Sequence, residues 1–143
     1  MVAKHFKLQE LVDRITYETE GEAAWSKLSP LLISALDGLW EFVQEKTSKT
    51  PVIIVNNWSF GGDSQWRGLR TENCTVGTNK SQHWKGCAAD CHVKGYDAEY
   101  IRGLILSDQN NPLIKDIMRM EAGVSWIHLD VKPVPNRIHL FNP

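Results

Sequence analysis

Residues 81–93, "SQHWKGCAADCHV", place a histidine and an aspartate seven positions apart, with one glycine and two alanines between them. Imidazole nitrogens and carboxylate oxygens are both good ligands for zinc. Gly86 and the alanines would let a loop pass close to a sheet and would keep the surroundings of a metal small. Because "CAADCHV" resembles a strand, we predict that His83 from a loop and Asp90 from a strand converge on one metal ion.

A third ligand is present in "SWIHLDV", residues 125–131. Side chains alternate along a strand, so His128 and Asp130 are expected on one face. Zinc in a hydrolase usually has three protein ligands and an open fourth position for water. We therefore predict that His83, Asp90 and His128 bind Zn²⁺, and that Asp130 contacts or lies beside the metal-bound histidine. The seven-residue spacing does not fit the helical H-E-x-x-H arrangement.

The order of predicted elements gives the fold class. Helical periodicity or capping signals predict helices over residues 6–15, 30–47 and 97–108, the second with Ser29 as its N-cap. Strand patterns occur at residues 51–58, 87–93, 114–121, 125–131 and 137–141. The segment 59–80, rich in Gly, Ser, Asn and Thr, is expected to be a long loop. We predict an α+β domain with a mostly antiparallel sheet and packed helices.

Composition limits the function classes. With 143 residues and 42% hydrophobic content, the chain fits one domain over residues 1–143. A net charge of −1 gives no electrostatic basis for nucleic-acid binding. No run of about 18 apolar residues predicts membrane insertion. The first residues lack the pattern of a secretory signal, so we expect synthesis in the cytoplasm.

The cysteines do not suggest a disulfide framework or a thiolate zinc site. Cys74, Cys87 and Cys91 are odd in number and form no C-x-x-C pair. Cys91 precedes His92, but neighbouring side chains on a strand point to opposite faces, which argues against a Cys-His nucleophile.

Two motifs resemble a known family. "SQHWKGCAAD" resembles the S-x-H-x-x-G-x-A-x-D motif of the zinc D-alanyl-D-alanine carboxypeptidase and L-alanyl-D-glutamate endopeptidase family, and "WIHLDV" resembles its W-x-H-x-D strand. "HFKLQELV" is similar to the opening helix of its phage-type, single-domain members. The resemblance implies a Hedgehog-like peptidase fold, peptidoglycan peptides as substrate, and His83, Asp90 and His128 as zinc ligands.

The catalytic base is less well defined by the resemblance. Many members have Glu or Asp three residues before the last histidine, where this chain has Ser125. Glu121 is the first candidate, because "MEAGVSWIH" resembles the E-x-x-V-x-W-x-H arrangement of short members. Asp130 is the second candidate for the base and the more plausible structural partner of a ligand.

A substrate-binding arginine is expected in "RGLR", which resembles an S-G-x-R turn of the family. Arg67 and Arg70 compete for this role, and Arg70 matches the motif position. A guanidinium there would bind a substrate carboxylate or the developing oxyanion. Three aromatic residues are candidates for the cleft wall: Trp66, Trp84 and Tyr96.

These features predict a zinc metallopeptidase that hydrolyses peptide bonds of bacterial peptidoglycan, either endolysin-like or D,D-carboxypeptidase-like. The expected site of action is the bacterial cell wall, reached by phage-type release or on a virion, and the chain is expected to act as a monomer. The alternative is a non-catalytic virion or cell-wall-binding module that retains the fold. Ser125 in place of the usual acid is the feature that favours the alternative.

Overall fold

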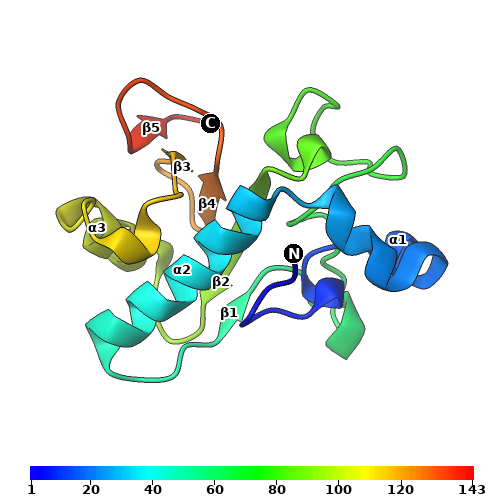
Figure 1. Ribbon diagram of the computed structural model, residues 1–143, viewed down its shortest axis with the longest axis horizontal. Coiled ribbons are helices and arrows are strands. Elements are labelled where there is room, and N and C mark those ends of the chain that lie inside the picture. The colour runs from blue at the N-terminus through cyan, green and yellow to red at the C-terminus, as the bar shows by residue number, and fades with distance from the viewer.

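A five-stranded mixed sheet lies against helix α2 in the computed structural model, which describes residues 1–143 (Figure 1). The strands are β1 (Ile53–Ile54), β2 (Ala88–Val93), β3 (Arg119–Glu121), β4 (Ile127–Asp130) and β5 (His139–Phe141). Their order across the sheet is β1-β2-β4-β3-β5. All neighbours are antiparallel except the parallel pair β3 and β5. The predicted α+β class is confirmed, and the Hedgehog-like fold stays a prediction.

Three α-helices and several 3₁₀ turns complete the chain. The helices are α1 (Arg14–Glu20), α2 (Pro30–Thr47) and α3 (Ala98–Ser107), and the 3₁₀ turns are η1 (Leu8–Glu10), η2 (Gly21–Lys27), η3 (Trp58–Phe60), η4 (Gln82–Lys85) and η5 (Pro112–Ile114). The prediction for α2 is confirmed, since the Ser29 side chain accepts a hydrogen bond from the Leu31 N–H at the helix start. Asp97 caps α3 in the same manner through the Tyr100 N–H. No helix has the length and apolar character needed to span a membrane.

The predicted helix over residues 6–15 is wrong. The apolar side chains of this segment are buried as expected except that of Ile15, which is 52% exposed, and the backbone forms only the short turn η1 before α1 begins at Arg14. The Asp13 side chain accepts the Thr16 N–H and so starts the helix late. The carbonyls of Leu11 and Val12 accept hydrogen bonds from the later loop instead of from a continuing helix. These long-range bonds override the local periodicity.

Two predicted strands are shorter than their sequence patterns. The strand expected over residues 51–58 pairs only at Ile53–Ile54, because the Asn56 N–H donates to the Glu10 carbonyl instead of to a strand. The strand expected over residues 114–121 begins at Arg119. Before it, the Asn111 side chain accepts the Leu113 N–H and starts η5. The long loop between residues 59 and 80 is confirmed apart from the turn η3, which overlaps its first two residues.

Alternation along the two central strands separates a core face from a polar face. Cys91 on β2 and Ile127 and Leu129 on β4 join the hydrophobic core shared with α2. Burial raises the pKa of the Cys91 thiol to about 12, which agrees with an inert core residue. Asp90 and His128 lie on the opposite face, so the sheet presents the predicted ligands away from α2.

Candidate metal site

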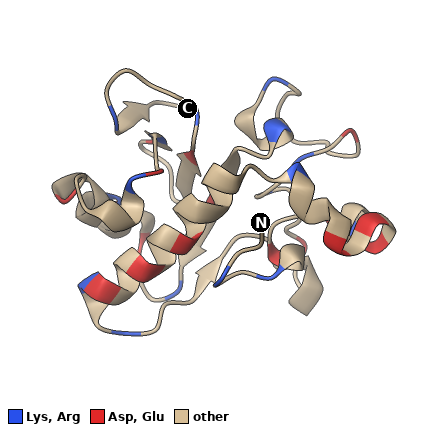
Figure 2. Cartoon of the chain, viewed as in Figure 1, with Lys and Arg blue, Asp and Glu red and all other residues tan.

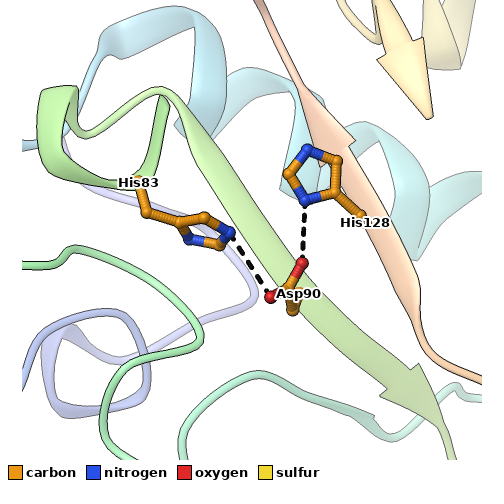
Figure 3. A group of neighbouring side chains, drawn as sticks. All are labelled: His83, Asp90 and His128. Atoms are coloured by element: carbon orange, nitrogen blue, oxygen red, sulfur yellow. Dashed lines mark hydrogen bonds and ion pairs between the residues drawn. The ribbon is translucent and has the colours of Figure 1, made fainter. Parts of the chain in front are cut away.

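Pairing of β2 with β4 brings two predicted ligands together. Asp90 lies directly opposite His128 in the antiparallel register. In the metal-free chain, His128 Nδ1 lies 2.8 Å from Asp90 Oδ1, and His83 Nε2 lies 3.4 Å from Asp90 Oδ2 (Figure 3). Figure 3 shows the carboxylate between the two imidazole rings. The three potential ligand atoms all lie within 4.8 Å of one another. We call His83, Asp90 and His128 the metal group.

A turn anchored on both sides presents His83. The Ser81 side chain caps η4 by accepting the His83 N–H, and Gly86 ends it with a left-handed φ of 67°. A Cβ at Gly86 would collide with the Lys27 carbonyl, while the Gly86 carbonyl accepts the Ser29 N–H. The small residue is therefore required, because the turn packs directly on the backbone ahead of α2. The prediction had Gly86 close to the sheet, and the structure places it instead against the backbone at Lys27 and Leu28.

A hydrogen bond also fixes the second ring nitrogen of His83. Nδ1 lies 2.9 Å from the Gly68 carbonyl oxygen, and this buried pair requires that Nδ1 carries the proton. Nε2 is the ring nitrogen that faces Asp90. A ligand histidine commonly donates its other N–H to a carbonyl or carboxylate in this way.

His128 is held by a carboxylate and an arginine. Its Nε2 lies 2.9 Å from Asp130 Oδ2, and Asp130 is fully buried. The Arg119 guanidinium donates to the same carboxylate from Nε, at 2.9 Å to Oδ1, and from Nη2, at 2.8 Å to Oδ2. Asp130 therefore fixes the ring so that Nδ1 points toward Asp90. This agrees with the prediction that Asp130 contacts the metal-binding histidine.

The charges of the metal group depend on one another. Burial lowers the pKa of His128, but hydrogen bonds to Asp130 and Asp90 outweigh it and raise the pKa to about 9. Burial raises the pKa of Asp90, but hydrogen bonds from His128 and His83 outweigh it and hold the pKa well below its usual range. The pKa of Asp130 is lowered by His128 and Arg119 against the same opposing effect of burial. In the metal-free protein, a protonated His128 therefore neutralises part of the negative charge.

The metal group opens into a cavity of about 380 Å³, which we call the metal cavity. Its lining consists of Arg70, Lys80, Ser81, Gln82, His83, Asp90, Arg119, Glu121, Trp126, His128, Lys132 and Phe141. Glu121 Oε2 lies 4.0 Å from His128 Nδ1, and Arg70 Nη2 lies 3.6 Å from Asp90 Oδ2. Asp130 does not reach the cavity surface. Of the two candidate carboxylates, only Glu121 lines the metal cavity.

The other candidates lie elsewhere. Arg67 donates toward His92 Nδ1 at 3.1 Å and does not line the metal cavity, whereas Arg70 does. The expectation for the aromatic wall is wrong, because Trp66, Trp84 and Tyr96 are absent from the lining and Trp126 and Phe141 are present. Ser125, at the position where the family often has an acid, is exposed and is not part of the cavity lining.

Arg119 and Phe141 line the metal cavity but were not predicted from the sequence. Arg119 and Glu121 are two positions apart on β3 and therefore lie on the same face of the strand. Placing Glu121 over the metal group would also have placed Arg119 there. Phe141 gave no comparable signal. It reaches the site because β5 pairs in parallel with β3, and its ring lies edge-on to His128 with centroids 5.5 Å apart.

The chemistry of the metal group fits a metal ion. Two imidazole nitrogens and one carboxylate form the donor set of many catalytic zinc sites, and tetrahedral ligands at zinc distances lie about 3.3 Å apart. The two contacts of Asp90, at 2.8 and 3.4 Å, bracket this spacing. In each histidine, the ring nitrogen that does not face Asp90 has its own hydrogen-bond partner: His83 Nδ1 contacts the Gly68 carbonyl, and His128 Nε2 contacts the Asp130 carboxylate. The metal group can therefore hold a metal ion.

Comparison of the chain with protein-family models, curated proteins and solved structures finds no match. The resemblance to the zinc peptidase family therefore stays a prediction that depends on the quoted motifs.

Proposed function

We propose that the protein is a zinc-dependent peptidase that hydrolyses peptide bonds of bacterial peptidoglycan. One observation carries the proposal: a His-Asp-His group with both opposite ring nitrogens occupied lies in a cavity beside the separate carboxylate of Glu121. A purely structural metal site is usually closed by a fourth protein ligand. Here the side chain next to the three candidate ligands is Glu121, which lines a cavity large enough for part of a peptide.

The proposed chemistry divides between the metal and the chain. When bound, zinc supplies a Lewis acid that polarises a carbonyl and acidifies water. Glu121 accepts a proton from the attacking water and delivers it to the leaving amine, so no covalent intermediate with the enzyme forms. Asp130 keeps the proton on His128 Nε2 and leaves Nδ1 free for the metal. This division gives the two acidic residues different roles.

Arg70 is proposed to stabilise negative charge on the substrate. Its Nε donates to the Trp66 carbonyl at 2.8 Å, so the guanidinium is fixed, and Nη2 faces the metal group. A fixed planar donor beside the scissile carbonyl is suited to a developing oxyanion. The peptidoglycan substrate, the cell-wall site of action and delivery by phage-type release or on a virion come from the motif resemblance.

The proposal is tested by incubating the zinc-loaded protein with purified peptidoglycan and measuring newly released amino groups. We expect release that depends on zinc, and none from the metal-stripped protein or from His83→Ala. Cell walls of several cross-link chemistries should be used, because the bond that is cut differs among them.

The same assay separates the enzyme from the alternative. If zinc remains bound and no wall type releases amino groups, the peptidase proposal is wrong. Binding to the walls without turnover would then support the non-catalytic module.

A further inference from the structure

A second cavity adjoins the metal cavity. It has a volume of about 300 Å³ and shares Arg119 and Lys132 with the metal cavity. The rest of its lining is Val134, Pro135, Asn136 and His139, so no carboxylate lines it. We call it the basic cavity. Two neighbouring cavities that share two cationic side chains can receive two parts of one ligand.

Arg119 has one free donor group fixed in place at this boundary. Its Nε and Nη2 are bound to Asp130, and its guanidinium lies over the Phe141 ring, with Cζ 4.6 Å from the ring centroid. Nη1 forms no hydrogen bond or ion pair within the chain. Because one edge and one face of the guanidinium are already held, binding an anion at Nη1 loses little side-chain entropy.

Lys132 adds a second cation without a partner. Its backbone N–H donates to Asp130 Oδ1 at 3.2 Å, which fixes the start of the 132–139 segment, while its ammonium group forms no ion pair. The chain as a whole carries a net charge of −1. Many of its acidic positions follow α2 and gather around α1 (Figure 2). The unpaired Lys132 ammonium group and the free Nη1 donor of Arg119 therefore differ from the overall charge and favour an anionic ligand.

We propose that the basic cavity binds a carboxylate of the same peptide whose scissile bond lies over the metal group. Arg119 Nη1 and Lys132 Nζ would donate to this carboxylate, leaving Arg70 for the oxyanion. The inference rests on the proposed function and adds a preference for peptides that carry a free carboxylate on one side of the cleaved bond.

The preference is measured with a blocked stem-type peptide that has a single free carboxylate, compared with the same peptide amidated at that position. For the zinc-loaded protein, we expect the carboxylate form to have a kcat/KM about tenfold higher, mainly through KM, as for one charge-assisted contact. Lys132→Met should lower this ratio toward one, with the remaining preference due to Arg119 Nη1. Lys49→Met is the matched control, because Lys49 is exposed at the end of α2 and should leave the ratio unchanged.

Anion binding is measured independently of turnover with sulfate at constant ionic strength. We expect saturable shifts of the Asn136 and His139 amide resonances in the zinc-loaded protein and in Lys49→Met, and weaker binding by about fivefold or more in Lys132→Met. An unchanged peptide ratio in Lys132→Met, or no sulfate response, would overturn the basic-cavity proposal even if peptidoglycan is hydrolysed. Sulfate binding without hydrolysis of any peptide would instead overturn the proposed function and, with it, the substrate assignment of this cavity.

Discussion

The two halves of the metal site are built in different ways. The strand half consists of Asp90 and His128, which lie opposite each other on β2 and β4, with Asp130 and Arg119 behind them. The loop half consists of His83 on η4, whose ring is held by a backbone carbonyl, that of Gly68. The strand half is therefore held by side-chain charges, and the loop half by backbone packing.

This difference determines which substitutions each half tolerates. In the strand half, replacing one carboxylate leaves a buried partner without its counter-charge, while the backbone stays in register. In the loop half, the Ser81 cap is the one side-chain contact to the His83 backbone, and the turn otherwise packs through its backbone, so the sensitive residues should include the glycines that allow close packing. Substitutions in the first half should therefore act through lost charge pairing, and substitutions in the second through lost backbone packing.

The largest effect is expected from removing a ligand. His83→Ala, Asp90→Ala and His128→Ala should each lower zinc affinity by more than about a thousandfold, because an incomplete set of three ligands cannot exclude solvent from the ion. His92→Ala is the matched control, since His92 contacts Arg67 and not the metal group. Elemental analysis after dialysis measures the bound metal. Near-stoichiometric zinc in one of the three variants would remove that residue from the site.

The next effect concerns turnover without loss of metal. Glu121→Gln should keep the fold and the zinc and lower kcat by about a hundredfold or more, the usual scale for a positioned acid/base. The amide keeps the size of the side chain but cannot accept the proton. Measured zinc content separates this effect from metal loss. Near-normal turnover in the zinc-loaded variant would exclude Glu121 as the base.

Asp130→Asn tests the carboxylate that supports His128 in the strand half. The substitution should weaken zinc affinity by about 10- to 100-fold, the usual cost of losing a carboxylate behind a ligand histidine. Added zinc should restore much of its activity by mass action, whereas it should not rescue Glu121→Gln. Hydrolysis measured against zinc concentration distinguishes them. If added zinc did not restore activity to Asp130→Asn, the assignment of Glu121 as base and Asp130 as support of His128 would have to be exchanged.

The strand half was predictable from sequence, and much of its surroundings was not. Alternation along "SWIHLDV" placed His128 and Asp130 on one face, and the small residues before Asp90 indicated close packing. These signals are local. Arg119 reaches the site through the pairing of β3 with the next strand, β4, and Phe141 through the parallel pairing of β5 with β3, which no turn signal indicates.

The N-terminal segment shows the opposite case. The apolar spacing of residues 6–15 is helical, and all its apolar side chains except that of Ile15 are buried, but the backbone carbonyls of Leu11 and Val12 bond to distant segments. Periodicity reports which side chains face the core and does not report where backbone hydrogen bonds go. The core residues were therefore predictable in a region where the element was not.

A smaller effect is expected from pH on the metal-free protein. The pKa of His128 is raised from 6.5 to about 9, so the folded state binds a proton more tightly than the unfolded chain. This stabilisation is complete below pH 6.5 and is lost as the pH rises through 9. With zinc bound, Nδ1 carries no proton, so zinc affinity should rise over the same range.

Thermal unfolding with chelator measures the decline. We expect the free energy of unfolding to fall by about 1–3 kcal/mol between the two pH values, and His128→Gln to flatten the slope. A metal-free protein whose stability is constant across this range would contradict the protonated His128 and its pairing with Asp90 and Asp130.

The smallest effect tests the loop half by comparing two glycines. Gly86 and Gly95 have similar left-handed backbones, with φ of 67° and 88°, but a Cβ at Gly86 would collide with the Lys27 carbonyl and a Cβ at Gly95 would meet nothing within 4 Å. Alanine at either position should cost about 1–2 kcal/mol from the backbone conformation alone. Any additional loss in Gly86→Ala therefore measures the close packing of η4.

Because His83 lies on η4, Gly86→Ala should also weaken zinc binding, by about two- to tenfold, less than the loss of a group that contacts the ligand directly. Gly95→Ala should leave zinc affinity unchanged, since it lies in the turn between β2 and α3 and contacts no ligand. Chemical unfolding and zinc titration of both variants provide the two readouts. If Gly86→Ala lost stability but kept full zinc affinity, the loop half would not depend on this packing. His83 would then be held by the Gly68 carbonyl at its ring and the Ser81 cap at its backbone, and the contrast between the two halves would depend on these two hydrogen bonds.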